Sequence, residues 1–162
     1  MTRIARLCVL VLGGILAAGP ADAGPAEPQA GKASVEAAVL AVHDAMTRAG
    51  EAADADQLFS YMAETDRGSV VQNGVVLATR QEALDAVRSN LRGISKIQYT
   101  WGRRLVTVLS PEIAVLVAEG VATVTMAAGD GFSAPLAQTV VFVLKDGAWK
   151  AVHAHNSSPR TR

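Results

Sequence analysis

Cysteine is almost absent from the sequence: a single residue, Cys8, occurs among 162, and it lies in an apolar run at the amino terminus. If that run is removed as a signal peptide, the mature chain has no thiol. A disulfide, a cysteine nucleophile and a zinc site with cysteine ligands are then excluded. The fold must be stabilised by an apolar core, for which an apolar content of 50% is sufficient. We expect neither a metal nor another cofactor.

An excess of charge of one sign and a supply of aromatic rings are missing as well. The 15 Lys and Arg residues balance the 15 Asp and Glu residues, and aromatic residues make up 4% of the chain. Proteins that bind nucleic acid present a basic surface, and those that bind single strands also use aromatic rings for base stacking. Nucleic acid is therefore not expected as a partner.

The amino terminus has the three parts of a signal peptide. Arg3 and Arg6 precede an apolar run over residues 7–18, and residues 21–23 have the small-x-small pattern of a cleavage site. We therefore expect a signal peptide over residues 1–23. An uncleaved membrane anchor is the alternative, although the run is short for a bilayer. The mature protein is then periplasmic or secreted, with no membrane contact after cleavage.

The rest of the chain is organised as one domain with a short lead-in. Residues 24–33 are rich in Pro, Gly and Ala and are expected to be flexible, and the domain is expected over residues 34–158. Apolar residues at helical spacing predict a first helix over residues 34–50, with Ser34 as N-cap, and a shorter helix after Asp54. A third helix begins at the capping box Thr79-x-x-Glu82.

The other segments have the pattern of antiparallel strands. Asn73-Gly74 and Asp146-Gly147 each have the residues of a tight hairpin turn. Strands are expected over residues 97–109, 113–126, 138–144 and 148–155, with a small hairpin over residues 68–77 and a loop over residues 127–135. Helices followed by long antiparallel strands indicate the α+β class, with the helices on one face of the sheet.

The strand over residues 113–126 is apolar on both faces. Ile113, Val117 and Val121 point one way, and small residues such as Ala118 and Ala122 point the other way. Helices cover only one face of such a sheet, so the other face needs a partner, and a second copy of the chain is the simplest one. We expect a homodimer through the sheet, with the small-residue face in contact. A covering loop, or an exposed alanine-rich surface, is the alternative.

Two histidines near the carboxyl terminus are candidates for chemistry. Strand alternation places His153 and His155 on one face with Trp149, and the strand rise puts the two imidazoles about 6 to 7 Å apart at Cα. Such a pair suits a shared metal, or a general base beside a substrate-orienting donor. It also suits a hydrogen-bonded, half-buried structural pair. A catalytic metal would need a third ligand, which the sequence does not identify.

Three aromatic residues are candidates for a ligand pocket. Tyr99 and Trp101 share one face of a long strand, and Tyr61 ends the second helix. Aromatic side chains with a polar tip offer contact area and one hydrogen bond to a ligand, and they suit an ordinary core or its rim equally well. His43 lies at the edge of the apolar face of the first helix, and Glu119 is the one carboxylate in the middle of a long strand.

The run Asp146-Gly147-Ala148-Trp149-Lys150-Ala151-Val152-His153-Ala154-His155-Asn156-Ser157 resembles the last hairpin of the SnoaL-like branch of the nuclear transport factor 2-like superfamily. The order of elements upstream is similar too, so the resemblance covers about residues 34–158. It implies a cone-shaped curved antiparallel sheet with three helices and a pocket inside, in a dimer packed through its sheets.

The resemblance implies several activities. The superfamily includes isomerases, cyclases and dehydratases as well as binding modules, so the fold does not determine the function. Its isomerases and cyclases use a carboxylate base in the pocket, and neither Glu119 nor Asp66 matches a family motif. The first hypothesis is an exported module that binds a small apolar molecule in the cone. The second is an isomerase, cyclase or hydrolase that uses His153 and His155 for proton transfer. The binding module is favoured because no complete catalytic set is visible. Tyr61, Tyr99, Trp101, Trp149, His153 and His155 are the expected pocket residues.

Overall fold

The computed structural model describes residues 27–65, 67 and 69–159. The signal peptide expected over residues 1–23 lies outside this part of the chain. In chain order, the elements are α1 (Glu27–Glu51), α2 (Ala55–Ser60), β1 (Val70–Gln72), β2 (Val75–Leu77), α3 (Arg80–Leu91), β3 (Ile94–Ser110), β4 (Ile113–Met126), β5 (Gly131–Lys145) and β6 (Ala148–Ser157).

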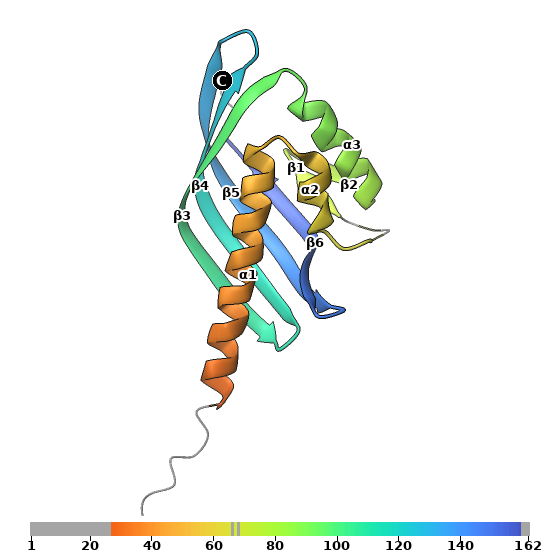
Figure 1. Cartoon of the computed structure of the whole chain (residues 1–162), viewed down its shortest axis with the longest axis vertical. Coiled ribbons are helices and arrows are strands. Elements are labelled where there is room, and N and C mark those ends of the chain that lie inside the picture. The colour runs from red at the N-terminus through yellow and green to blue at the C-terminus, as the bar shows by residue number, and fades with distance from the viewer. Residues whose placement is uncertain (1–26, 66, 68, 160–162) are drawn as a thin grey trace, which may run out of the picture.

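The strands form one curved, unclosed sheet in the order β2-β1-β6-β5-β4-β3. Neighbouring strands are antiparallel except β1 and β6, which run parallel. Figure 1 shows α1 crossing the sheet in front of β3, β4 and β5, with α2 and α3 beside the short strands β1 and β2. The predicted α+β class, with three helices and a cone-shaped antiparallel sheet, is confirmed.

Local signals set the turns and the third helix as predicted. Asn73 and Gly74 have φ angles of 51° and 84°, and Asp146 and Gly147 have 52° and 76°, which are the positive values that a tight hairpin requires. The Thr79 side chain accepts a hydrogen bond from the Glu82 amide, and the Glu82 carboxylate accepts one from the Thr79 amide. This capping box satisfies amide groups that the first turn of α3 would otherwise leave free.

Two predicted boundaries are wrong. The first helix begins at Glu27 rather than Ser34, so the lead-in expected over residues 24–33 is helical from Glu27 onward. A proline in the first turn costs little, because no amide hydrogen is needed there, and Pro28 is therefore compatible with this start. The loop expected over residues 127–135 ends early, because β5 begins at Gly131 and pairs with β4 from Gly131 to Val143.

The helix-covered face of the sheet carries the core. Val39 and Met46 of α1 pack in one cluster with Ala114, Leu116 and Ala118 of β4. Ala118 is only 2% exposed. Small side chains on β4 let the helix lie close to the sheet, so the prediction that this small-residue face meets a second copy is wrong.

The opposite face of the sheet, which we call the outer face, exposes several large apolar side chains among polar ones. Its side chains include Leu105 on β3, at 54% exposure, and Val117 and Val121 on β4, at 47% and 41%. None of the helices in the described part of the chain is long and apolar enough to cross a membrane.

Candidate functional site

A cavity of about 300 Å³ lies between the helices and the inner face of the sheet. Its lining comes from α1, α2, α3 and from strands β1 and β3–β6. The residues that the following argument uses are His43, Thr47, Tyr99, Trp101, Gln138 and Asn156. A partly enclosed cavity of this kind can bury much of a small molecule's surface, which is what ligand sites require.

Two aromatic rings form one wall of the cavity. Tyr99 and Trp101 are stacked, with 5.7 Å between ring centroids and 7° between planes. The Trp101 indole donates a hydrogen bond to Thr47 Oγ1 at 2.9 Å, and the Thr47 hydroxyl donates to the carbonyl of His43 at 2.9 Å. The indole is thereby fixed against α1, and both rings contribute aromatic surface to the cavity lining.

Three neutral polar side chains form a hydrogen-bonded chain at the cavity, which we call the amide relay. His43 Nε2 lies 2.9 Å from Gln138 Oε1, and Gln138 Nε2 donates to Asn156 Oδ1 at 2.7 Å. His43 is 1% exposed, and within the described residues its Nδ1 has no hydrogen-bond partner. The relay connects α1, β5 and β6 across the inner face of the sheet.

The electrostatics of the site favour neutral groups. Burial lowers the pKa of His43 below its usual range, and the nearby Arg104 adds to this effect. The hydrogen bond with Gln138 and the charge of Asp44 act in the opposite direction. Burial also raises the pKa of the Tyr99 phenol, with a smaller contribution from Glu51. His43 and Tyr99 are therefore neutral near pH 7.

Carboxylates are missing from the cavity lining in the described part of the chain, as are Lys and Arg. Glu51 accepts a hydrogen bond from the backbone amide of Tyr99 at 2.8 Å, not from the phenol. Glu119 lies on the outer face, where it pairs with Arg103 at 3.3 Å. In the same part of the chain, no three His, Cys, Asp or Glu residues are grouped so that they could hold a metal ion.

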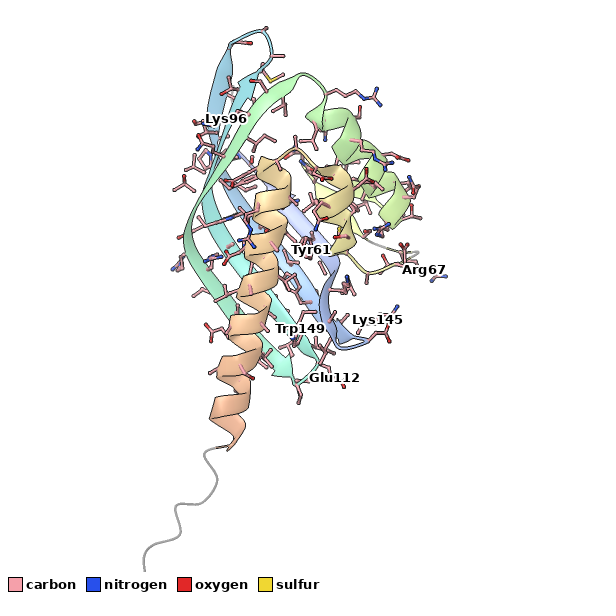
Figure 2. All side chains as sticks on the ribbon, in the orientation of Figure 1. Tyr61, Arg67, Lys96, Glu112, Lys145 and Trp149 are labelled. Atoms are coloured by element: carbon pink, nitrogen blue, oxygen red, sulfur yellow. The ribbon has the colours of Figure 1, made fainter. Side chains whose placement is uncertain are left out.

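The structure brings together only two of the six expected pocket residues. Tyr99 and Trp101 line the cavity, whereas Tyr61 and Trp149 are not among its lining residues. The Tyr61 hydroxyl accepts a hydrogen bond from Gln57 at the end of α2. Figure 2 places Trp149 near Glu112 and Lys145, at the opposite end of the sheet from Lys96. Lys96 lies between Ile94 and Ile97, which line the cavity, so Trp149 is remote from it.

The two carboxyl-terminal histidines do not share a face with Trp149, so that prediction is wrong. A register shift between Val141 and Phe142 leaves Val152 as the extra residue of a bulge in β6. Because a bulge reverses the alternation of side chains, Ala151 and Ala154 are both buried although they are three residues apart. His153 and His155, which pair with Val141 and Thr139, lie on the outer face instead.

Sequence reasoning missed two residues of the amide relay, Gln138 and Asn156, and did not connect His43 with them. Gln138 is the one amide in the run Gln138-Thr-Val-Val-Phe-Val-Leu144, and Asn156 follows the histidines. An isolated amide at an inward position of an apolar strand signals a buried hydrogen-bonding partner, because an unpaired one would be costly. His43 lies at the edge of the apolar face of α1, and spacing in the sequence does not identify its partners on β5 and β6.

A wider groove of about 740 Å³ lies nearer the carboxyl terminus, between Trp101, Glu119, Pro135 and Ser157. It is open to solvent along much of its length, and Glu119 in its wall is already paired with Arg103. A small molecule would leave more of its surface in water there than in the smaller cavity. The smaller and more enclosed cavity is therefore the better candidate for a ligand site.

The fold and the sequence are similar to those of known proteins. A family model for the SnoaL-like domain matches residues 39–161. A search of curated proteins finds no match. Among solved structures, a nuclear transport factor 2-like superfamily protein from Salmonella enterica matches with a TM-score of 0.73 and 13% identity, over 80% of this chain and 94% of that chain.

Two further structures have names that refer to an activity. A proposed dehydratase of the NTF2-like family from Streptomyces avermitilis matches with a TM-score of 0.70 and 20% identity, over 80% of this chain and 99% of that one. Hexachlorocyclohexane dehydrochlorinase from Novosphingobium barchaimii matches with a TM-score of 0.68 and 12% identity, over 82% and 91%. At such identities these similarities show the fold alone. Because the family model covers most of the domain, the chain belongs to the SnoaL-like domain family of the nuclear transport factor 2-like superfamily.

Proposed function

We propose that the protein binds a small, neutral, largely apolar molecule in the cavity of the cone. The observation that carries this proposal is the lining: a stacked aromatic pair and neutral polar side chains, with no charged side chain among the described lining residues. An apolar body gains free energy by leaving water for such a wall, at about 25 cal/mol per Å² of apolar surface. A charged ligand would lose its hydration without finding a counter-charge.

An enzyme of the isomerase, cyclase or hydrolase type is the second candidate, and the similar structures named for a dehydratase and a dehydrochlorinase favour it. Such chemistry needs a base inside the cavity. His153 and His155 lie on the outer face, which leaves His43 as the one imidazole among the described lining residues. Because one His43 nitrogen is already engaged with Gln138, we rank binding first.

Export and dimerisation belong to the same proposal. The features of residues 1–23 support secretion to the periplasm or beyond, and intact-mass measurement of protein from the native host tests this, since retention of Met1 would contradict it. The exposed apolar side chains of the outer face support a homodimer through that face rather than through the helix-covered one.

A fluorescence titration with N-phenyl-1-naphthylamine, a neutral apolar probe, tests the binding proposal. We expect saturable enhancement with the wild type and a loss of at least about tenfold in affinity for Trp101→Ala, which removes one ring of the aromatic wall. Trp149→Ala is the matched control, because it removes the other indole of the chain at the far end of the sheet. Equal losses in the two variants, or no saturable binding to the wild type, would contradict the proposal.

A further inference from the structure

The amide relay has a direction that decides which ligand group the cavity accepts. Each amide side chain offers a carbonyl oxygen on one side and an NH₂ group on the other, so hydrogen bonds along the relay must all point the same way. Whether His43 Nε2 donates or accepts therefore determines which group of Asn156, at the other end, is available to a ligand: the NH₂ group or the carbonyl oxygen.

Two arrangements of a neutral His43 are conceivable. In the first, Nε2 carries the proton and donates to Gln138 Oε1, Gln138 Nε2 donates to Asn156 Oδ1, and the His43 Nδ1 lone pair is unpaired. In the second, both amides are turned over, and an Nδ1–H group is buried without an acceptor. The Nδ1 atom is buried and unpartnered within the described residues. Orphaned buried N–H groups are rarer than under-satisfied acceptors, which favours the first arrangement.

The first arrangement leaves Asn156 with a free donor. Its Oδ1 is occupied by Gln138, whereas no hydrogen bond within the described residues engages its Nδ2. Asn156 is half-buried and lines the cavity, so its NH₂ group is available to a ligand. Hydrogen bonds in such a chain polarise one another, which strengthens the donor at the end.

We propose that the amide relay presents Asn156 Nδ2 as a hydrogen-bond donor to the neutral carbonyl oxygen of a ligand whose apolar body packs on Tyr99 and Trp101. His43 acts as a positioning residue, because it sets the direction of the relay. A carboxylate ligand would offer an acceptor too, but the described lining contains no cation to balance its charge. This inference rests on the proposed binding function and specifies its ligand class.

A matched pair of probes tests the assignment. 2-Acetylnaphthalene and 2-ethylnaphthalene have similar shapes, and only the first has a carbonyl oxygen. In titrations that displace N-phenyl-1-naphthylamine, we expect the ketone to bind about three- to tenfold more tightly than the hydrocarbon, because it gains one hydrogen bond. Equal affinities would overturn the donor assignment and leave the proposed function intact. Absence of saturable binding by all three probes would overturn both.

Two variants with the same chemical change locate the donor. Asn156→Asp replaces the NH₂ group by a second oxygen and should abolish the ketone preference. Asn90→Asp makes the same change at another lining residue, outside the relay, and should retain the preference. A ketone preference that persists in Asn156→Asp, or that disappears equally in both, overturns the assignment.

Two variants and one NMR measurement test the role of His43. His43→Gln retains an N–H donor for Gln138 and should retain the ketone preference, whereas His43→Leu should lose it while still binding the hydrocarbon. NMR of the wild type tests the same point without a substitution. We expect a proton on His43 Nε2 and a shift of the Asn156 side-chain amide signals with the ketone only. A proton on Nδ1 alone, or unchanged Asn156 signals, would overturn the proposal.

Discussion

Trp101 of β3 and Gly120 of β4 are paired across the sheet, with the indole lying directly against the glycine. A Cβ atom at position 120 would be 3.0 Å from Trp101 Cε3 and 2.5 Å from the carbonyl oxygen of Thr100. Side chains do not approach backbone that closely. The glycine is therefore what lets the indole lie low on the sheet and leave the cavity above it open.

Gly120→Ala should destabilise the protein and displace the indole. Relief of the contact with Thr100 requires the backbone to shift, and overpacking of this kind costs about 1 to 3 kcal/mol. Thermal melts measure the loss, and the probe titration should show weaker binding because the aromatic wall moves. Gly31→Ala is the control, since a Cβ there meets open space in α1 and alanine favours a helix. A Gly120→Ala protein as stable as the wild type would contradict this account of the cavity.

Burial of neutral His43 should make stability depend on pH. Its pKa is lowered in the folded state, so below the unfolded value of about 6.5 the unfolded chain binds a proton that the folded chain does not. The free energy of unfolding therefore falls as the pH drops from about 7 to about 5, with a contribution of up to about 1.4 kcal/mol per pH unit. Chemical denaturation at several pH values measures this slope. His43→Gln, which has no titrating group, should show a flatter dependence, and identical slopes would contradict the prediction.

Most of the fold could be predicted because its signals are local. The capping box at Thr79 and Glu82 and the turns at Asn73-Gly74 and Asp146-Gly147 act within a few residues, and each lies where predicted. The start of α1 was missed because Ser34 resembles an N-cap, although its hydroxyl donates to the carbonyl of Gly31 inside a longer helix.

The site was harder to predict because it depends on register between distant strands. Trp149 and His155 have the spacing of one strand face, and a single bulge residue, Val152, separates them onto two faces. Nothing in the sequence around Val152 signals the bulge. His43 and Gln138 are 95 residues apart, and only the tertiary fold brings them within 2.9 Å.

Val117→Arg should dissociate the dimer that we propose for the outer face. The valine is exposed and lies opposite Leu105, and the carboxylate of nearby Glu119 is already paired with Arg103, so an arginine there would place an added charge in the interface. Light scattering over a range of concentrations measures the mass. Gln81→Arg, on the exposed side of α3, introduces the same group elsewhere and should leave the mass unchanged. A wild type that is monomeric at micromolar concentration would rule the dimer out.

Ala118→Arg should affect stability and oligomeric state differently from Val117→Arg. Ala118 is buried beneath α1, so the arginine would disrupt the core and not an interface between copies. We expect a large drop in melting temperature for the Ala118 variant and a small one for the Val117 variant. Dissociation without loss of stability in the Ala118 variant would instead place the helix-covered face in the dimer.

The three histidines of the chain allow one substitution to be compared in two environments. His43→Ala removes a cavity wall and leaves the Gln138 carbonyl without its donor, which should cost about 1 to 3 kcal/mol of stability and weaken probe binding. His153→Ala and His155→Ala change the outer face, on the far side of the sheet from the cavity. Their affinity for the probe should stay within about twofold of the wild type, or about 0.4 kcal/mol. Thermal melts and the N-phenyl-1-naphthylamine titration give both quantities for each variant. If His153→Ala or His155→Ala weakens binding as much as His43→Ala does, the ligand contacts the outer face and the cavity is not its site.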